Sequence, residues 1–316
     1  MTDDAPVRYV LVWFDYAPIL RDSVVPIRRM IEDTISEPPE RVEIDVWLES
    51  PGGDAHAAYK LALLLRHHAK HVRVVVPEYA KSAATLLALA GHEIYMAPSS
   101  ELGPLDAQLL EEGSMQGSIS AISIAQAADD LAQDAIELAV QGGAPMLRLM
   151  RLGRAETLDS LLRFSASFTE PLVRQLDPKK VHDAKQTLRV TQVYATDLLT
   201  PVLADHAKAG EIANHLVGGF PGHDFVISAT EAKCRGLPIF PLVDYDNAEM
   251  VCIAHRLFED TDESRISFHR MTDILSTEEE GRTSDDQATD PTDGDGGHSV
   301  ESHRAPPTLR AIEEGA

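Results

Sequence analysis

The sequence contains few of the residues that define several classes of protein. Its 316 residues include only two cysteines, Cys234 and Cys252, whose separation matches no metal-ligand spacing. This excludes a disulfide framework and a zinc ribbon and predicts a reducing compartment, by default the cytoplasm. Basic residues are scarce too, with 28 Lys and Arg against 51 Asp and Glu. Because an acidic surface repels phosphate backbones and no basic stripe interrupts it, nucleic-acid binding is disfavoured.

Long apolar runs are also missing. The apolar run Val7–Phe14 near the N-terminus is too short to cross a bilayer or to form the core of a signal peptide. We therefore expect no integral membrane segment. With 44% hydrophobic residues, the chain has enough material for one large or two small domains.

The last part of the chain differs in composition from the rest. Residues 276–316 carry 11 acidic and 3 basic side chains, together with Gly, Pro, Ser and Thr and almost no large apolar residues. Such a segment cannot bury enough surface to offset the entropy lost on ordering. It is predicted to be a disordered acidic tail that aids solubility.

The first hundred residues alternate between strand and helix patterns. Helices are expected at Val24–Thr34, after Asp54 as N-cap, and from about Ser82 to Ala90. The order of these elements predicts a parallel sheet with right-handed crossovers. The expected strands are Val7–Phe14, Arg41–Glu49, Val72–Val76 and Ile94–Met96.

The remaining residues suggest a mainly helical region and then a return to the sheet. From about Leu110 to Val217 helix formers dominate, with prolines expected to punctuate the helices at Pro145, Pro171, Pro178 and Pro201. A short strand at Phe225–Ile227 and a helix capped by Ser228 follow. We therefore predict four regions: an α/β core (1–110), a helical region (111–217), a returning strand and helix (218–275) and the tail (276–316).

Two turns at the carboxyl ends of predicted parallel strands could carry chemistry, because ligands bind at that edge of an α/β sheet. Gly52 and Gly53 let the chain turn sharply and expose backbone N–H groups, as an oxyanion hole requires. Ser82 lies at the start of a small-residue helix, where the helix dipole and the Ala83 N–H favour negative charge. On their own, these features could also be an ordinary turn and an N-cap.

The spacing of the two turns carries a resemblance. Glu49-Ser50-Pro51-Gly52-Gly53-Asp54, followed by Ser82 in Ala-Lys-Ser-Ala-Ala-Thr-Leu-Leu-Ala-Leu-Ala-Gly, resembles the Clp protease/crotonase superfold. With the segments 77–86 and 100–108, the chain is more closely similar to the serine dehydrogenase proteinase family. The resemblance is strong over about residues 42–110 and resumes from His223 through Leu237.

This resemblance implies a Clp/crotonase-like spiral of parallel βα units, to which the helical region and the acidic tail are added. It further implies a homo-oligomeric serine hydrolase in which Ser82 is the nucleophile. The backbone N–H groups of the Gly52-Gly53 turn, chiefly Gly53, and of Ala83 would form the oxyanion hole. No cofactor is implied. A metal site is not predicted either, because His67 and His71 lack a third ligand.

The sequence departs from the Clp pattern where the general base is needed. Clp-type peptidases have a histidine on the strand after the nucleophile helix, and that position here is Leu105 or Asp106. An aspartate with an ordinary pKa near 4 is a poor base for a serine hydroxyl at neutral pH. Another residue must therefore supply the base, if the chain has one.

Several residues are candidates for that role. His223 could reach the sheet edge from the returning segment, although a lone histidine before a strand is more often structural. A lysine base is used by signal peptide peptidases; Lys81 adjoins Ser82, whereas Lys60 and Lys185 lie on predicted helices. Asp106 could orient the base or hold its own turn.

The sequence therefore predicts a cytoplasmic serine peptidase, or a related acyl hydrolase, that acts on protein or peptide substrates. Two rival hypotheses remain. One is an acyl-CoA hydratase or thioesterase on the same fold, which would need an entrance that accepts coenzyme A. The other is a non-catalytic scaffold in which Ser82 is only an N-cap.

Overall fold

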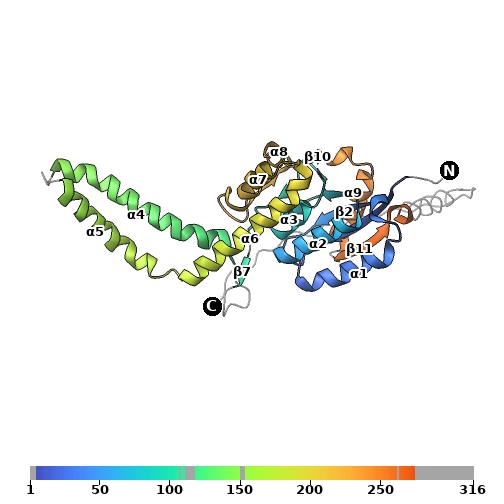
Figure 1. The fold of residues 1–316 in the computed structure, drawn as a ribbon, viewed down its shortest axis with the longest axis horizontal. Coiled ribbons are helices and arrows are strands. Elements are labelled where there is room, and N and C mark those ends of the chain that lie inside the picture. The colour runs from blue at the N-terminus through green and yellow to red at the C-terminus, as the bar shows by residue number, and fades with distance from the viewer. Residues whose placement is uncertain (1–4, 107, 111–117, 150–153, 262, 275–316) are drawn as a thin grey trace, which may run out of the picture. The chain divides into compact units, whose positions relative to one another are not determined.

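The computed structural model describes residues 5–106, 108–110, 118–149, 154–261 and 263–274. The predicted tail at 276–316 lies outside these residues. A six-stranded sheet, called the central sheet below, has the strand order β10-β5-β3-β2-β1-β11 (Figure 1). The strands are parallel except β11, which pairs antiparallel with β1. Their bounds are β1 Val7–Phe14, β2 Val42–Glu49, β3 His71–Val76, β5 Glu93–Met96, β10 Ile239–Pro241 and β11 Arg265–Arg270.

Both faces of the sheet are buried, which explains why its central strands are nearly continuous apolar runs. Along β1, the side chains of Tyr9, Leu11 and Trp13 join the larger core. The side chains that alternate with them, among them Val10 and Phe14, join a second core on the opposite face. The observed strand–helix order confirms the predicted α/β class.

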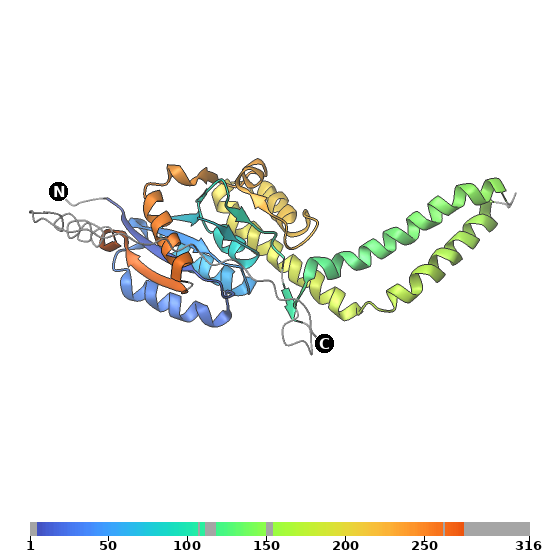
Figure 2. The same ribbon diagram turned by 180° about the vertical axis from the view of Figure 1, so that it is seen from behind.

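Helices on the larger core cover one face of the sheet. They are α1 (Val24–Thr34), α2 (Ala55–His68) and α3 (Ala83–Ala88), whose apolar side chains share that core with residues of α6 (Pro178–Leu203) and α7 (His206–Gly218). The other face is covered by α9 (Ala248–Thr261), which the sequence analysis did not predict. Figure 2 shows the same arrangement from behind.

The predicted N-caps and helix bounds are largely confirmed. Asp54 precedes α2, and its carboxylate accepts a hydrogen bond of 2.8 Å from the Ala57 N–H. Ser228 caps α8 (Ala229–Cys234) by accepting one of 3.2 Å from the Glu231 N–H. The helix predicted from Ser82 begins one residue later, because Ser82 itself has a non-helical backbone.

The described residues between 108 and 218 form a β-hairpin and four helices. The hairpin pairs β7 (Gln108–Leu110) with β8 (Ser118–Ser120). It is followed by α4 (Ala121–Leu149) and α5 (Arg154–Val173), and α4 packs along both α5 and α6 (Figures 1 and 2).

The expectation that prolines separate these helices is correct only for Pro178, which begins α6. Pro145, Pro171 and Pro201 instead lie inside α4, α5 and α6. Each of the three lies in the last one or two turns of its helix. A proline there removes one backbone hydrogen bond near an end that frays in any case, so the helix continues past it.

A small second sheet brings distant parts of the chain together. Its strands are β4 (Tyr79–Ala80), β6 (Glu101–Leu102) and β9 (Ile227–Ser228), in that order. The strand expected at Phe225–Ile227 is β9, which begins two residues later than expected. Because β4 precedes Ser82, β6 precedes Asp106 and β9 follows His223, this sheet places all three residues near one another.

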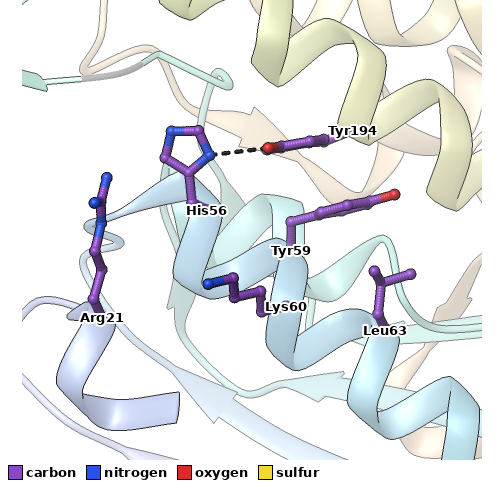
Figure 3. A pocket seen from close by; sticks show the side chains of 6 residues that line it. All are labelled: Arg21, His56, Tyr59, Lys60, Leu63 and Tyr194. Carbon is purple, nitrogen blue, oxygen red and sulfur yellow. Dashed lines mark hydrogen bonds between the residues drawn. The ribbon is translucent and has the colours of Figure 1, made fainter.

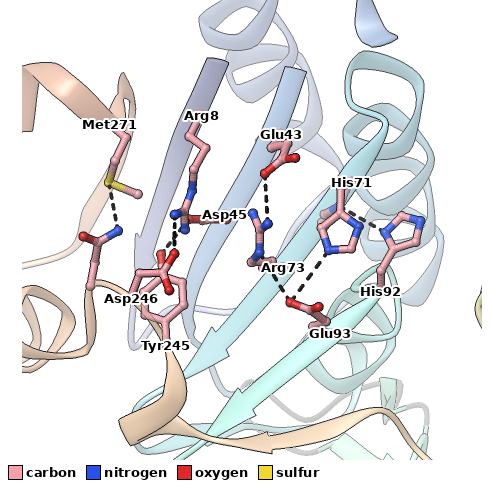
Figure 4. A network of polar contacts seen from close by, with 12 residues as sticks. Arg8, Glu43, Asp45, His71, Arg73, His92, Glu93, Tyr245, Asp246 and Met271 are labelled. Carbon is pink, nitrogen blue, oxygen red and sulfur yellow. Dashed lines mark hydrogen bonds and ion pairs between the residues drawn. The ribbon is translucent and has the colours of Figure 1, made fainter. Parts of the chain in front are cut away.

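A buried carboxylate on β2 links three neighbouring strands of the central sheet, β1, β2 and β3 (Figure 4). The side chain of Asp45 is fully buried, and its two oxygens lie 2.5 Å from Arg8 Nη2 and 3.3 Å from Arg73 Nη1. The hydroxyl of Tyr245 donates a third contact of 2.6 Å. Burial alone would lower the pKa of Arg8, but the Asp45 carboxylate outweighs it and raises that pKa above its ordinary value.

Replacement of this carboxylate is expected to destabilise the protein strongly. Asp45→Ala leaves two partly buried guanidinium groups without their shared anion, which costs about 3 kcal/mol of unfolding free energy. Chemical denaturation monitored by circular dichroism measures the change. Asp246→Ala is the control, because Asp246 also pairs with Arg8 but its side chain is 74% exposed. A midpoint for Asp45→Ala equal to that of Asp246→Ala would contradict the assignment.

No helix in the described ranges is long and apolar enough to cross a membrane.

Candidate active site

Ser82 lies between β4 and α3 with a strained backbone. Its φ of 47° and ψ of −116° lie outside the regions that L residues favour. Ala204 is the one other non-glycine residue with positive φ in the described part of the chain. Such strain costs on the order of 1–3 kcal/mol and is concentrated at functional sites.

The Ser82 side chain is not an N-cap. Its hydroxyl forms no bond to the N–H groups of α3 but donates a hydrogen bond of 2.6 Å to the backbone carbonyl of Asp106. The interpretation of Ser82 as a helix cap is therefore wrong. The strained backbone turns the hydroxyl away from its own helix and toward the loop that carries Asp106.

The Gly52-Gly53 turn packs directly against this serine. A methyl group added at Gly52, where φ is +100°, would lie 2.5 Å from the Lys81 carbonyl oxygen and 2.9 Å from the Ser82 Cβ. Only glycine allows this approach. At Gly53, where φ is +140°, a methyl group would meet the backbone of Ile19. Backbone bonds fix the turn, since Ile19 N–H donates to the Gly52 carbonyl and Asp54 N–H to the Ile19 carbonyl.

The predicted oxyanion-hole residues differ in the hydrogen bonds that they make. The Gly52 N–H already donates to the Ser50 hydroxyl oxygen over 3.2 Å, so Gly52 supplies space rather than a free donor. The N–H groups of Gly53 and Ala83 have no acceptor among the residues that the structure describes. These two N–H groups remain the available pair for an oxyanion.

Asp106 connects the serine to a histidine. Its side chain is fully buried, and Oδ2 lies 3.2 Å from His223 Nδ1. The two atoms are at ion-pair distance, and neither of them forms a hydrogen bond within the described ranges. The other carboxylate oxygen accepts a bond of 3.0 Å from the N–H of Ile122, in the first turn of α4. Asp106 therefore contacts Ser82 through its main chain and His223 through its side chain.

The environment of His223 changes its proton affinity. Contact with the Asp106 carboxylate raises the pKa of His223 above the ordinary 6.5 and outweighs partial burial, which lowers it. The side chain is 26% exposed, and it borders an open cavity of about 720 Å³ lined also by Ser120, Ser123 and Phe225. Because Nδ1 is next to the carboxylate, Nε2 is the nitrogen left to exchange a proton with a reacting group.

The raised pKa of His223 leads to a testable titration. We expect the His223 ring protons to titrate by NMR with a midpoint above 6.5, and the signal is assigned by its loss in His223→Gln. In Asp106→Asn the midpoint should fall. The protonated form stabilises the fold below pH 6.5, and this contribution is lost as the pH rises through the raised pKa. A midpoint at or below 6.5 in the unmodified chain would contradict the observed pairing.

The lysines considered as the general base either pair with a carboxylate or line a different cavity. Lys81 Nζ lies 2.5 Å from Glu101 Oε1, and an ammonium held by a carboxylate is a poor proton acceptor. Lys185 Nζ lies 2.8 Å from Asp129 on α4. Lys60, which is on α2, lines a different cavity. Of the predicted candidates, the structure joins Ser82, Asp106 and His223 and leaves the lysines in other pairs or places.

The sequence analysis missed two residues that hold this site together. The buried Thr85 hydroxyl donates to the Ala80 carbonyl and accepts from the Gly103 N–H, which fixes β4 against the segment leading to Asp106. Glu49, just before the glycine turn, is buried and pairs with His255 of α9. The only sequence signal for either is a polar residue inside an apolar stretch.

Residues 17–141 match the family of ClpP-like SDH-type serine proteinases. Over this stretch the chain is similar to that family. The match confirms the predicted resemblance and the Clp-like α/β fold, and it includes Ser82, the glycine turn and Asp106. His223 lies outside the matched residues.

Two curated relatives come from Methanocaldococcus jannaschii, and both are named uncharacterized proteins. MJ1495 is 26% identical over 64% of this chain and 53% of its own length. MJ0137 is 28% identical over 70% of this chain and 62% of its own length. The chain thus spans less than two thirds of either relative.

One solved structure that resembles the chain is a serine-to-alanine mutant of the 1510-N membrane-bound stomatin-specific protease. It shares 18% identity, covers 49% of this chain and 69% of its own, and superposes with a TM-score of 0.30.

Proposed function

We propose that the protein is a serine peptidase in which Ser82 is the nucleophile and His223, oriented by Asp106, is the general base. The observation that carries this proposal is the position of Asp106, which accepts the Ser82 hydroxyl on its carbonyl and contacts His223 through its carboxylate. Nucleophile, base and orienting carboxylate are the parts that acyl transfer needs. The matched family of serine proteinases supports the same reaction class.

The proposed reaction proceeds in two steps, acylation of Ser82 and hydrolysis of the acyl group. Rotation of the Ser82 side chain releases its hydroxyl from the Asp106 carbonyl toward His223. Oγ attacks the peptide carbonyl carbon while His223 Nε2 takes the proton, and the oxyanion is held by the N–H groups of Gly53 and Ala83. The C–N bond then breaks, and the leaving amine takes the proton from His223. Water, activated by the same histidine, releases the acyl group and restores Ser82.

We also propose that the chain acts as a homo-oligomer. Stable folds seldom leave many large apolar side chains in water along one helix. Sedimentation velocity tests the proposal, and a monomer at micromolar concentration would contradict it. The large apolar side chains exposed on α5 are Leu158, Leu162, Phe164, Phe168, Leu172 and Val173. The predicted cytoplasmic location and lack of nucleic-acid binding stay predictions.

Cleavage of a fluorescent unfolded casein tests the function and separates the rival hypotheses. The full chain should release peptides, and the release should be inhibited by a fluorophosphonate. Hydrolysis or hydration of a coenzyme A thioester without peptide release would instead favour the acyl-CoA hypothesis. Failure of every substrate to react would favour the scaffold.

A further inference from the structure

Two cavities that share Arg21 and His56 lie beside the glycine turn, and we refer to them together as the groove. Its inner part, of about 340 Å³, is bordered by Gly53, Arg21, His56 and residues of α6 such as Thr187. Its outer part, of about 460 Å³, shares Arg21 and His56 and adds Tyr59, Lys60, Leu63 and Tyr194. Volumes of this size accommodate several side chains of a ligand.

The wall of the outer part is pre-organised. The rings of Tyr59 and Tyr194 stack with centroids 4.0 Å apart, and His56 Nδ1 lies 2.9 Å from the Tyr194 hydroxyl (Figure 3). The Tyr59 hydroxyl in turn contacts Asp197 at 3.4 Å. A rigid aromatic wall lowers the entropy that binding costs.

The charge of the groove is opposite to that of the protein. The chain carries a net charge of −23, yet the groove is lined by the cations Arg21 and Lys60. Figure 3 shows the Lys60 amine extending toward the Arg21 side of the cavity, with the tyrosine rings on the other side. Arg21 pairs with Asp54 at 2.8 Å, whereas Lys60 has no acidic partner within the described ranges.

We propose that this groove binds an acidic side chain of the peptide substrate, close to the bond that is cleaved. Lys60 would pair with the carboxylate, and Tyr59 and Leu63 would contact its apolar stem. With Asp54 balancing Arg21, the lining holds a net charge near +1, which matches one carboxylate rather than the several phosphates of coenzyme A. The position of the groove relative to the scissile bond rests on the proposed function, because Gly53 is its proposed oxyanion donor.

Peptide binding to the Ser82→Ala variant tests the groove without requiring catalysis. The probes are two fluorescein-labelled decapeptides, one with three Glu around a single Phe and one with Gln in their place. At low salt, the Glu peptide should bind about fivefold more tightly, as for an exposed ion pair. Lys60→Gln should reduce the ratio below about two, and Lys60→Glu should invert it. The matched control is Lys233→Gln, which removes an exposed lysine of α8 and should leave the ratio unchanged.

Several results would overturn the assignment. These are equal affinities for the two peptides, no binding of the Glu peptide, or a preference that survives Lys60→Gln. Displacement of the peptide by coenzyme A in a Lys60-dependent way would assign the groove to a nucleotide instead. The proposed function would be wrong, and the groove assignment would still hold, if the unmodified chain binds the Glu peptide with the predicted preference but does not cleave it.

Discussion

Ser82→Ala is expected to reduce peptide hydrolysis by about 10⁴-fold or more, because removal of the attacking oxygen leaves only binding and the oxyanion hole. The fold should be retained. Alanine lacks the hydrogen bond to the Asp106 carbonyl, and the loss of such a bond costs about 1 kcal/mol. Initial rates on fluorescent casein and denaturation midpoints measure the two effects.

The control for this variant is Ser160→Ala. Ser160 is an exposed serine of α5, so its replacement should alter neither rate nor stability. If Ser82→Ala keeps more than a tenth of the original activity, another group must be the nucleophile. The assignment of Ser82 would then be wrong even if the chain is a peptidase.

Asp106→Asn is expected to lower the hydrolysis rate by about 10²- to 10⁴-fold without unfolding the protein. An asparagine can keep its oxygen on the Ile122 N–H, which places its NH₂ group beside His223 Nδ1. That arrangement favours the tautomer with the proton on Nε2, which cannot accept another from Ser82. The lost charge also removes the main cause of the raised His223 pKa.

Asp224→Asn is the matched control for this prediction. Asp224 adjoins His223 and also raises its pKa, but it is exposed and forms no ion pair with Nδ1 within the described ranges. Its replacement should shift the acidic limb of the pH–rate profile slightly and leave the maximal rate unchanged. Equal losses in the two variants would indicate a general electrostatic effect instead of an orienting role for Asp106.

The parts of the fold set by local patterns were predictable from the sequence. The apolar run at β1 and the amphipathic pattern of α1 gave the observed bounds, Val7–Phe14 and Val24–Thr34. Short elements that depend on distant partners were less accessible. The strand β11 pairs antiparallel with β1, from which it is separated by most of the sequence, and α9 covers the second core. Their own residues do not specify those partners.

The candidate site likewise has one part that local sequence patterns indicate and another that they do not. Ser82 and the glycine turn lie within about thirty residues of each other, and both carry a local signal in the sequence. The pairing of Asp106 with His223 joins segments more than a hundred residues apart. It depends on the small sheet of β4, β6 and β9, whose two-residue strands leave almost no pattern to detect. The sequence could therefore name His223 and Asp106 as candidates but not their contact.

The central claim is that His223 activates Ser82, and its most direct test is the pH dependence of labelling by a fluorophosphonate. Mass spectrometry of the labelled chain should locate the adduct on Ser82. The labelling rate should rise with pH through a midpoint above 6.5, and His223→Gln should abolish this rise. An adduct on another residue, or a pH profile of Ser82 labelling that His223→Gln leaves unchanged, would contradict the account.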